Sequence, residues 1–181
     1  MLRPIAADGV GVVHSSPPAA ESGPTRTAAD DRLSVELTSV VAGARRRALR
    51  DGDRHIDTAH LLHSLLETDP AVSALFDGGQ VARLLGYLVQ RSIGYGLQWQ
   101  GAVEDSGAMP VVREAAGWSP AAAGAMEAAL VRAGARGARQ VGGVDLLVTL
   151  AQDPECRAVE VLGRAGVDPA ALVAAVTAAA D

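Results

Sequence analysis

One half of the chain repeats the other at an offset of 85 residues, and this internal repeat constrains the fold more than any other feature. The positions that superpose at this offset include Ser34 and Ser119, Ala48 and Ala133, Ile56 and Val141, and Leu61-Leu62 and Leu146-Leu147. A one-residue gap after Leu150 also lays Asp69-Pro70 over Asp153-Pro154. Each half is too small to bury a hydrophobic core alone. We therefore expect the two halves to pack against each other about a pseudo-twofold axis.

Both halves show the spacing of apolar residues that is typical of amphipathic helices. The helices predicted in the first half run from Leu33 to a stop at Asp51-Gly52-Asp53, from Asp57 or Thr58 through a Leu-rich segment, from Asp69-Pro70 to about Phe76, and over 81–92. Those predicted in the second half begin at Ser119-Pro120, near Gly143, at Asp153-Pro154 and at Asp168-Pro169. A capping residue followed by proline marks a helix start, because the first helical N–H has no intrahelical partner to lose. The sequence therefore predicts an all-α fold of two pseudo-symmetric four-helix repeats in one globular domain.

The domain boundaries follow from where this periodicity begins and lapses. Residues 1–31 combine several prolines with Ser, Gly, Thr and Asp and have no helical or strand period, so we expect a flexible tail. Residues 32–181 form the predicted double repeat, with repeat one at about 33–92 and repeat two at about 118–179. A linker of about 93–117, which contains Trp99, separates them.

Composition excludes several classes of function. All 16 basic residues are Arg, and without Lys neither a Walker A phosphate loop nor a Schiff-base site is expected. The net charge of −5 disfavours nucleic acid as a partner. Cys156 is the single cysteine, the N-terminus has no signal-peptide pattern, and no apolar run approaches ~18 residues. We expect a cytoplasmic protein without a membrane segment, and the Ala-, Gly-, Val- and Arg-rich composition is typical of a GC-rich bacterial genome.

No constellation of catalytic residues is apparent. The serines lack a Gly-x-Ser-x-Gly elbow and Cys156 has no histidine nearby in sequence, so neither an enzyme nor a cofactor is expected. His60 and His63, preceded by Asp57, have a spacing that could share a metal ion, but a capping or packing role for His60 is the preferred interpretation. The arginines of 45–47 and Arg50 are interpreted as a solvated helix face rather than a nucleic-acid patch.

A short turn that leads into a Leu-Leu helix occurs twice, as Arg54-His55-Ile56-Asp57-Thr58-Ala59-His60-Leu61-Leu62 and as Arg139-Gln140-Val141-Gly142-Gly143-Val144-Asp145-Leu146-Leu147. These two segments resemble the double Clp repeat, the N-terminal domain of Clp-type unfoldase ATPases and of ClpC in particular. The resemblance implies an all-helical docking platform that receives adaptor proteins, degrons including phosphoarginine, and, in actinobacteria, cyclic-peptide antibiotics. Because no ATPase module fits in the remaining residues, we expect a freestanding module that binds such ligands without unfolding them.

The resemblance also implies a ligand groove. Trp118 stands where the family has a Phe before the Ser/Thr-Pro of repeat two, Glu127 falls on a family glutamate, and Val41 matches an apolar position of repeat one. Ala123 replaces a family Lys, and Leu33 completes the predicted set of ligand- and peptide-binding residues.

The residues that would pair with a phosphoarginine guanidinium are changed. In the family a Thr-Glu-His turn supplies a glutamate for this purpose, whereas this chain has Ala59 in the first copy and Val144 in the second. A methyl group cannot replace a bidentate carboxylate. Phosphoarginine recognition of the usual kind is therefore not expected, while an apolar groove is retained.

Three functions follow as hypotheses. The first is a non-catalytic binding module that acts as an adaptor or regulator of a ClpC–ClpP system, or as a decoy that sequesters ClpC N-domain ligands such as cyclic-peptide antibiotics. The second is an all-helical regulator whose arginine-bearing first helix contacts nucleic acid. The third is a structural partner of another protein chain.

Overall fold

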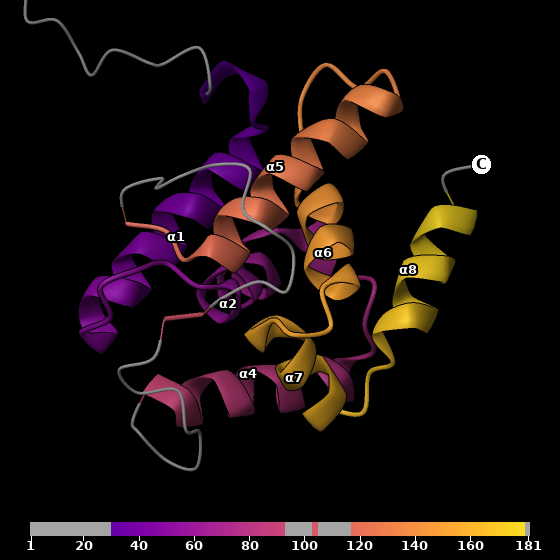
Figure 1. The fold of residues 1–181 in the computed structure, drawn as a ribbon. Helices are drawn as coiled ribbons and strands as arrows, with labels where there is room; N and C mark the ends of the chain where they lie inside the picture. Colours follow the sequence, from indigo (N-terminus) through magenta and orange to yellow (C-terminus); the bar gives the residue numbers. More distant parts are fainter. Residues whose placement is uncertain (1–29, 93–102, 105–116, 180–181) are drawn as a thin grey trace, which may run out of the picture.

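The computed structural model describes residues 30–92, 103–104 and 117–179, and within them it shows a purely helical architecture with two isolated β-bridges (Figure 1). The elements are η1 (Asp30–Arg32), α1 (Val35–Asp51), α2 (Thr58–Thr68), α3 (Pro70–Ser73), α4 (Gly78–Ser92), α5 (Pro120–Ala135), α6 (Gly143–Gln152), α7 (Arg157–Arg164) and α8 (Pro169–Ala178). The predicted all-α fold is confirmed. Most of the predicted tail 1–31 and linker 93–117, with Trp99, lies outside the described residues, and those boundaries stay predictions.

The helix start predicted at Ser119-Pro120 is confirmed, whereas the helix predicted from Leu33 begins two residues later, at Val35, after the equivalent serine Ser34. Ser34 is the N-cap of α1 and its hydroxyl accepts a hydrogen bond from the Leu37 N–H at 3.1 Å. Ser119 caps α5 in the same way, accepting from the Ala122 N–H at 3.2 Å. An N-cap oxygen satisfies a backbone donor that the helix itself cannot, so matching caps place both helices in matching registers. Of the two candidates for α2, the cap is Asp57.

The predicted start at Asp153-Pro154 is wrong by three residues. The carboxylate of Asp153 accepts from the Glu155 N–H at 3.1 Å, but the chain then makes a turn and α7 begins only at Arg157. Cys156, the N-cap residue, makes no side-chain capping bond, and the Arg157 N–H donates instead to a carboxylate oxygen of Glu104 at 2.7 Å. The cap of this helix therefore comes from a residue 53 positions away, which local sequence signals do not reveal.

Two short β-bridges show the pseudo-twofold relation directly. Leu33 pairs with Val141, where the Ser34 N–H donates to the Val141 carbonyl at 2.9 Å. Ile56 pairs with Trp118, where the Ser119 N–H donates to the Ile56 carbonyl at 2.8 Å. The 85-residue offset exchanges one bridge for the other. Since each bridge joins the residues before one long helix to those after the other, α1 and α5 run antiparallel.

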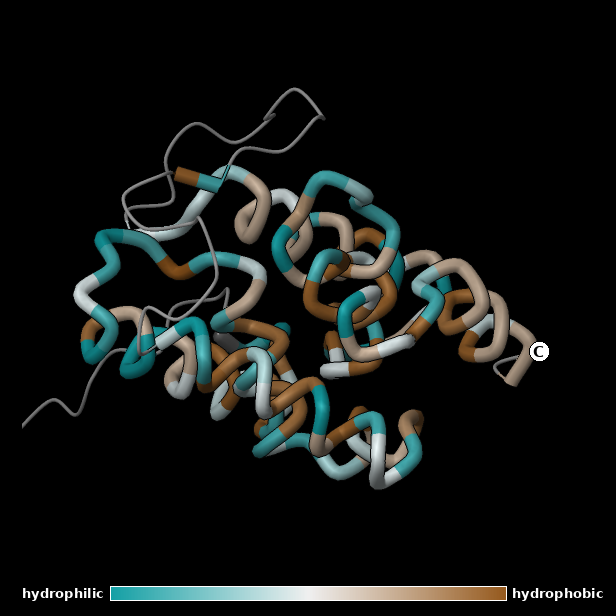
Figure 2. The backbone as a smooth tube through the Cα atoms, turned by 90° about the horizontal axis from the view of Figure 1, so that it is seen from below, coloured by the Kyte–Doolittle hydropathy of each residue, from teal (hydrophilic) through white to brown (hydrophobic). Residues whose placement is uncertain are grey.

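The core lies where the Leu-rich helices of the two repeats meet. Helix α2 packs against α6, and each also packs against helices of the opposite repeat, α2 against α5 and α7, and α6 against α1 and α3. The leucines at 61, 62, 146 and 147 are fully buried. Figure 2 shows apolar residues concentrated where helices face one another. One core is thus shared by both repeats, as expected for halves that are individually too small.

Among the described residues, no single helix has both the length and the apolar composition to cross a bilayer. Helices α7 and α8 reach that composition only as a pair, and the pair is bent by 96°.

Candidate functional site

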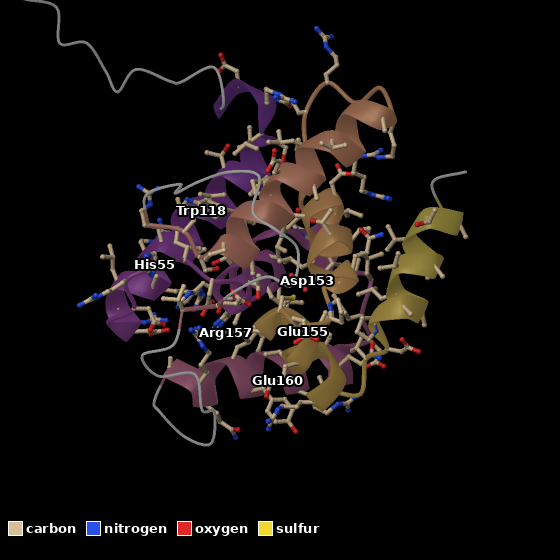
Figure 3. All side chains as sticks on the ribbon, viewed as in Figure 1. His55, Trp118, Asp153, Glu155, Arg157 and Glu160 are labelled. Atoms are coloured by element: carbon tan, nitrogen blue, oxygen red, sulfur yellow. The ribbon has the colours of Figure 1, made fainter. Side chains whose placement is uncertain are left out.

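The five residues of the predicted groove lie along α1 and α5 but do not form one cluster. Trp118 is half-buried immediately before α5, at the bridge to Ile56 (Figure 3). Leu33, also half-buried, lies before α1 at the other bridge, and it is therefore at the opposite end of the antiparallel helix pair. Because α1 has 17 residues and rises about 1.5 Å per residue, these ends are roughly 25 Å apart.

The other three predicted residues occupy half-buried positions between these ends. Ala123 and Glu127 are one helical turn apart on α5 and share a face, while Val41 follows the buried Val40 on α1. We call Trp118, which precedes α5, together with Ala123 and Glu127 on the first turns of that helix, the strip. Leu33 is not part of that strip.

A buried ionic cluster, unforeseen from the sequence, lies at the start of α2. The Asp57 carboxylate caps α2 by accepting from the His60 N–H at 2.8 Å. Its other oxygen accepts from Arg157 Nη1 at 2.7 Å and from the guanidinium of Arg91. Burial by itself raises the pKa of Asp57, but the hydrogen bond and charge of His60 and the charge of Arg91 outweigh it and hold the pKa well below its usual value. Asp57 is therefore a buried, ionised carboxylate that ties α2 to α4 and α7.

The same cluster contains Asp57 and His60, two of the three residues whose spacing in the sequence suggested a metal site. Asp53, Asp57 and His60 bring one potential ligand atom each within 4.8 Å of one another. Arg91, however, reaches all three, with Nη2 3.0 Å from an Asp53 oxygen and also bonded to Asp57, and Nη1 3.0 Å from His60 Nε2. The guanidinium occupies the position that a metal cation would need. His63 contacts Glu67 at 3.1 Å rather than this group, so His60 and His63 have different partners.

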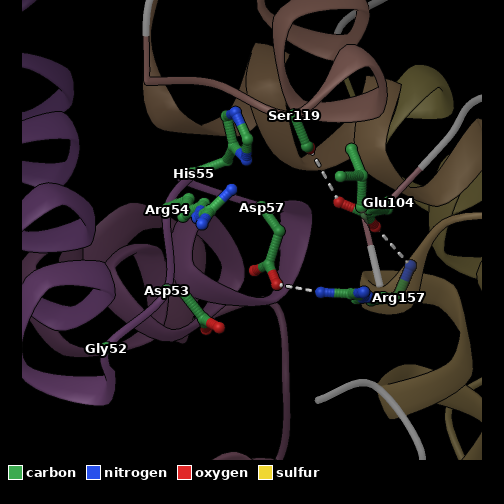
Figure 4. Close-up of a pocket in the computed structure, with 9 residues that line it drawn as sticks. Gly52, Asp53, Arg54, His55, Asp57, Glu104, Ser119 and Arg157 are labelled. Atoms are coloured by element: carbon green, nitrogen blue, oxygen red, sulfur yellow. Dashed lines mark hydrogen bonds and ion pairs between the residues drawn. The ribbon is translucent and has the colours of Figure 1, made fainter. Parts of the chain in front are cut away.

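A second unforeseen feature is the seat of the Glu104 side chain, shown in Figure 4. One carboxylate oxygen accepts from the Thr58 N–H at 2.8 Å and from the Ser119 hydroxyl at 3.0 Å. The other accepts from the Arg157 N–H at 2.7 Å and from the Thr58 hydroxyl. We call these donors, from Thr58, Ser119 and Arg157, the Glu104 cradle. Glu104 is 5% exposed, and an acidic residue followed by Asp105 in a predicted linker has no sequence signal that would have identified it.

Cavities of similar size lie at equivalent places in the two repeats, but their chemistry differs. The first, of about 450 Å³, is lined by residues that include Arg54, His55, Glu104 and Arg157. The second, of about 460 Å³, has Gly143 at the position equivalent to Thr58. Its lining includes the acidic residues Glu36, Asp69 and Asp145, of which Asp145 is paired with Arg136 at 2.7 Å. None of the five predicted groove residues lines either cavity.

The two positions at which the family has a glutamate for phosphoarginine are occupied here by Ala59 and Val144. Ala59 is fully buried and Val144 half-buried at the starts of α2 and α6. Neither side chain can pair with a guanidinium.

The arginines of α1 are mostly solvated, as the sequence interpretation holds. Arg45, Arg46 and Arg50 are exposed, and Arg47 is paired with Glu67. None of the chain's aromatic residues falls between positions 45 and 50, so the aromatic platform typical of single-strand binding is missing from this stretch.

Cys156 is placed as a structural residue. Its thiol is buried and donates to the Leu150 carbonyl at 3.2 Å, and burial raises the pKa of the thiol to about 11. Since the thiolate is the reactive form, we expect alkylation of the native protein at pH 8 to be at least about 100-fold slower than that of a free cysteine. Mass spectrometry after timed iodoacetamide treatment measures this rate, and unfolding in guanidinium should restore it. Fast labelling of the folded protein would contradict the burial.

Comparison with known proteins identifies the fold. No family model and no curated protein sequence matches the chain. The N-terminal domain of the caseinolytic protease associated chaperone ClpD from Arabidopsis thaliana has a similar structure, with a TM-score of 0.56 and 18% identity over 81% of this chain and 93% of that one. A protein studied as part of a malarial protein secretion system matches with a TM-score of 0.60 and 17% identity, over 82% of this chain and 95% of the other. The protein has a Clp N-domain-like fold.

Proposed function

We propose that this protein is a non-catalytic docking module of a Clp system, and that it binds peptide ligands through the strip formed by Trp118, Ala123 and Glu127 on α5, with Val41 of α1 beside it. The Clp N-domain-like fold, which extends over about four fifths of the chain, supports a role in the Clp system. The resemblance of the two turn segments to ClpC N-domains points to the same ligands, namely adaptors, degron peptides and cyclic-peptide antibiotics.

The observation that carries the proposal is the placement of Trp118. Its flanking backbone is held by hydrogen bonds to Ile56 on both sides, through the Gly117 carbonyl and the Ser119 N–H, each at 2.8 Å. The indole is nevertheless only half-buried, in a chain whose aromatic content is 3%. A large aromatic side chain on a rigid backbone is the typical anchor of a binding surface, because little conformational entropy is lost when it is covered.

Binding at this strip has two alternative consequences for the Clp system. As an adaptor or regulator, the module delivers or withholds ligands for an unfoldase. As a decoy, it sequesters ligands that would otherwise occupy a ClpC N-domain. Ala123 stands where the family has a Lys, so the strip is more apolar here than the resemblance implies for ClpC. A more apolar strip suits an apolar macrocyclic ligand.

The direct test is calorimetric titration with a cyclic peptide that binds ClpC N-domains. We expect the wild-type protein to bind it and Trp118→Ala to weaken binding about 30-fold or more, since central aromatic anchors contribute at least about 2 kcal/mol. Trp118→Phe should retain most of the affinity. Val131→Ala is the matched control, because Val131 is an apolar residue on the same helix that is 69% exposed and lies outside the strip. Absence of binding, or equal loss in Trp118→Ala and Val131→Ala, would contradict the proposal.

Adaptor and decoy are separated by a degradation assay with purified ClpC and ClpP. An adaptor or regulator changes the rate of substrate degradation when no cyclic peptide is present. A decoy leaves that rate unchanged and reverses only the effect of added cyclic peptide, with the stoichiometry of its binding.

A further inference from the structure

The outer face of the C-terminal half of α1 carries three arginines around an exposed leucine. Arg45, Arg46 and Arg50 are exposed, and Leu49, which lies one helical turn after Arg45 and Arg46, is 74% exposed. We call these four residues the basic face of α1. Arg45 and Arg46 form no ion pair with any residue that the structure describes. Arg50 makes one weak contact, with its Nε 3.6 Å from an Asp51 oxygen.

These charges are not required to form the helix. No acidic residue lies three or four positions before or after Arg45 or Arg46, so neither has a partner on its own helix. Arg46 and Arg50 are four residues apart, and like charges at this spacing destabilise a helix. The arginines therefore weaken α1 slightly rather than support it.

The fold does not require these charges either. At the equivalent places of α5, 85 positions later, the residues are Leu130, Val131, Gly134 and Ala135. Helix α5 thus occupies its pseudo-symmetric position with uncharged residues throughout this stretch. The chain has a net charge of −5, so the basic face is a positive region on a protein that is negative as a whole.

We propose that the basic face of α1 docks an acidic segment of a partner protein, with an apolar side chain of that segment covering Leu49. Charge complementarity determines the class of partner, because a guanidinium binds a carboxylate through two parallel N–H donors. Leu49 lies between the arginines and gains free energy when an apolar side chain removes it from water. This surface is separate from the strip at Trp118, and its partner does not depend on the ligand proposed there.

An acidic protein segment fits this face better than a nucleic acid does. Affinity for a phosphate backbone comes from many neutralised phosphates, whereas the basic face offers three cations on a negatively charged chain. No aromatic residue falls between positions 45 and 50 to stack on a base. A phosphate backbone would also leave Leu49 without an apolar partner.

Titration calorimetry at about 20 mM salt tests the proposal with a blocked synthetic peptide of repeated Glu-Glu-Leu triplets. We expect the wild type to bind it, and the double variant Arg45→Gln, Arg46→Gln to bind about tenfold more weakly, since each exposed ion pair is worth up to about fivefold in affinity. Leu49→Ala should weaken binding about fivefold. A rise to about 200 mM salt should weaken wild-type binding at least about tenfold, because exposed charges are screened.

Arg139→Gln and Val131→Ala are the matched controls. Arg139 is exposed near the bridge of Val141 to Leu33, at the opposite end of the α1 and α5 pair, and Val131 is 69% exposed on α5. Both variants should keep the wild-type affinity. All the substituted side chains are exposed, so every variant should fold with nearly unchanged stability. Absence of binding by the wild type, or equal losses in the controls, would overturn the proposal.

Three further results would also overturn it. Tighter binding of a DNA duplex than of the peptide, lost in the double variant, would assign the face to nucleic acid. A mass in sedimentation equilibrium that rises with protein concentration in the wild type but not in the double variant would assign it to a second copy of this chain. Equal affinity for a peptide of Glu-Glu-Ala triplets would show that Leu49 is not covered.

Discussion

Asp57→Ala should lower the free energy of unfolding by about 3–5 kcal/mol. The change leaves the guanidinium groups of Arg91 and Arg157 buried beside an alanine, each having lost its bond to the Asp57 carboxylate. It also removes the N-cap of α2, because the Asp57 carboxylate accepts a hydrogen bond from the His60 N–H. Removing one partner of a buried ion pair is far more costly than losing an exposed pair, because the remaining charge is not resolvated.

Urea unfolding followed by circular dichroism measures this loss. Asp168→Ala is the matched control, since Asp168 caps α8 with hydrogen bonds to Ala170 and Ala171 but is exposed and has no ion pair among those seen in the described residues. The control should lose about 1 kcal/mol, the usual contribution of a cap. Similar losses in the two variants would show that the ionic cluster adds nothing to the cap.

The same residue determines a pH dependence. The folded-state pKa of Asp57 lies below its usual value, so its contribution is fully present above the unfolded pKa of about 3.9 and is lost as the pH falls toward the folded value. The wild type should therefore lose stability steeply below about pH 4. Asp57→Asn, which cannot titrate at this position, should start from lower stability and show a shallower decline over that range.

Gly143→Ala should destabilise the protein by about 2 kcal/mol, although the same substitution usually strengthens a helix. A Cβ at Gly143 would lie against the Asp69 carboxylate and 2.9 Å from Leu65 Cδ2. Asp69 cannot move freely, because it is buried and caps α3 through the N–H groups of Ala71 and Val72. The added methyl group therefore forces either the cap or the core leucine out of place.

Gly124→Ala provides the control for this second substitution. Gly124 is exposed within α5 and has no atom within 4 Å of the position of an added Cβ. Its replacement should raise the free energy of unfolding by up to about 1 kcal/mol, the difference in helix propensity. Thermal unfolding of the two variants should thus shift in opposite directions, and shifts of the same sign would contradict the close contact at Gly143.

Most of the helices could be predicted because their signals are local. Ser119 and Asp168 cap helices where the sequence places them, and Gly143 begins one. These residues act on N–H groups two or three positions away, so a single sequence contains both partners. The start of α7 could not be predicted, because its cap is supplied by Glu104 and not by the nearby Asp153.

The candidate sites divide in the same way. The place of Trp118 before a helix start follows from the capping signal Ser119-Pro120, whereas its half-buried state is known only from the structure. Its separation from Leu33 became evident only from the two β-bridges, which put the equivalent residues at opposite ends of the α1 and α5 pair. Arg91 was not singled out by any motif, yet it fills the place between Asp53, Asp57 and His60 that spacing alone leaves open to a metal ion.

Periodicity, caps and the 85-residue repeat by themselves determined that this chain is helical and that its two halves share one core. Such features depend on interactions between neighbouring residues and on the burial of apolar faces, both of which the order of residues encodes directly. Only the tertiary structure decided that the repeats differ in charge at their equivalent cavities. Glu104 reaches donors 15, 46 and 53 positions away, and Asp69 lies against Gly143 across the repeat interface. Contacts over such separations arise when the core brings the repeats together, and they place the Glu104 carboxylate beside one cavity and the Asp69 carboxylate beside the other.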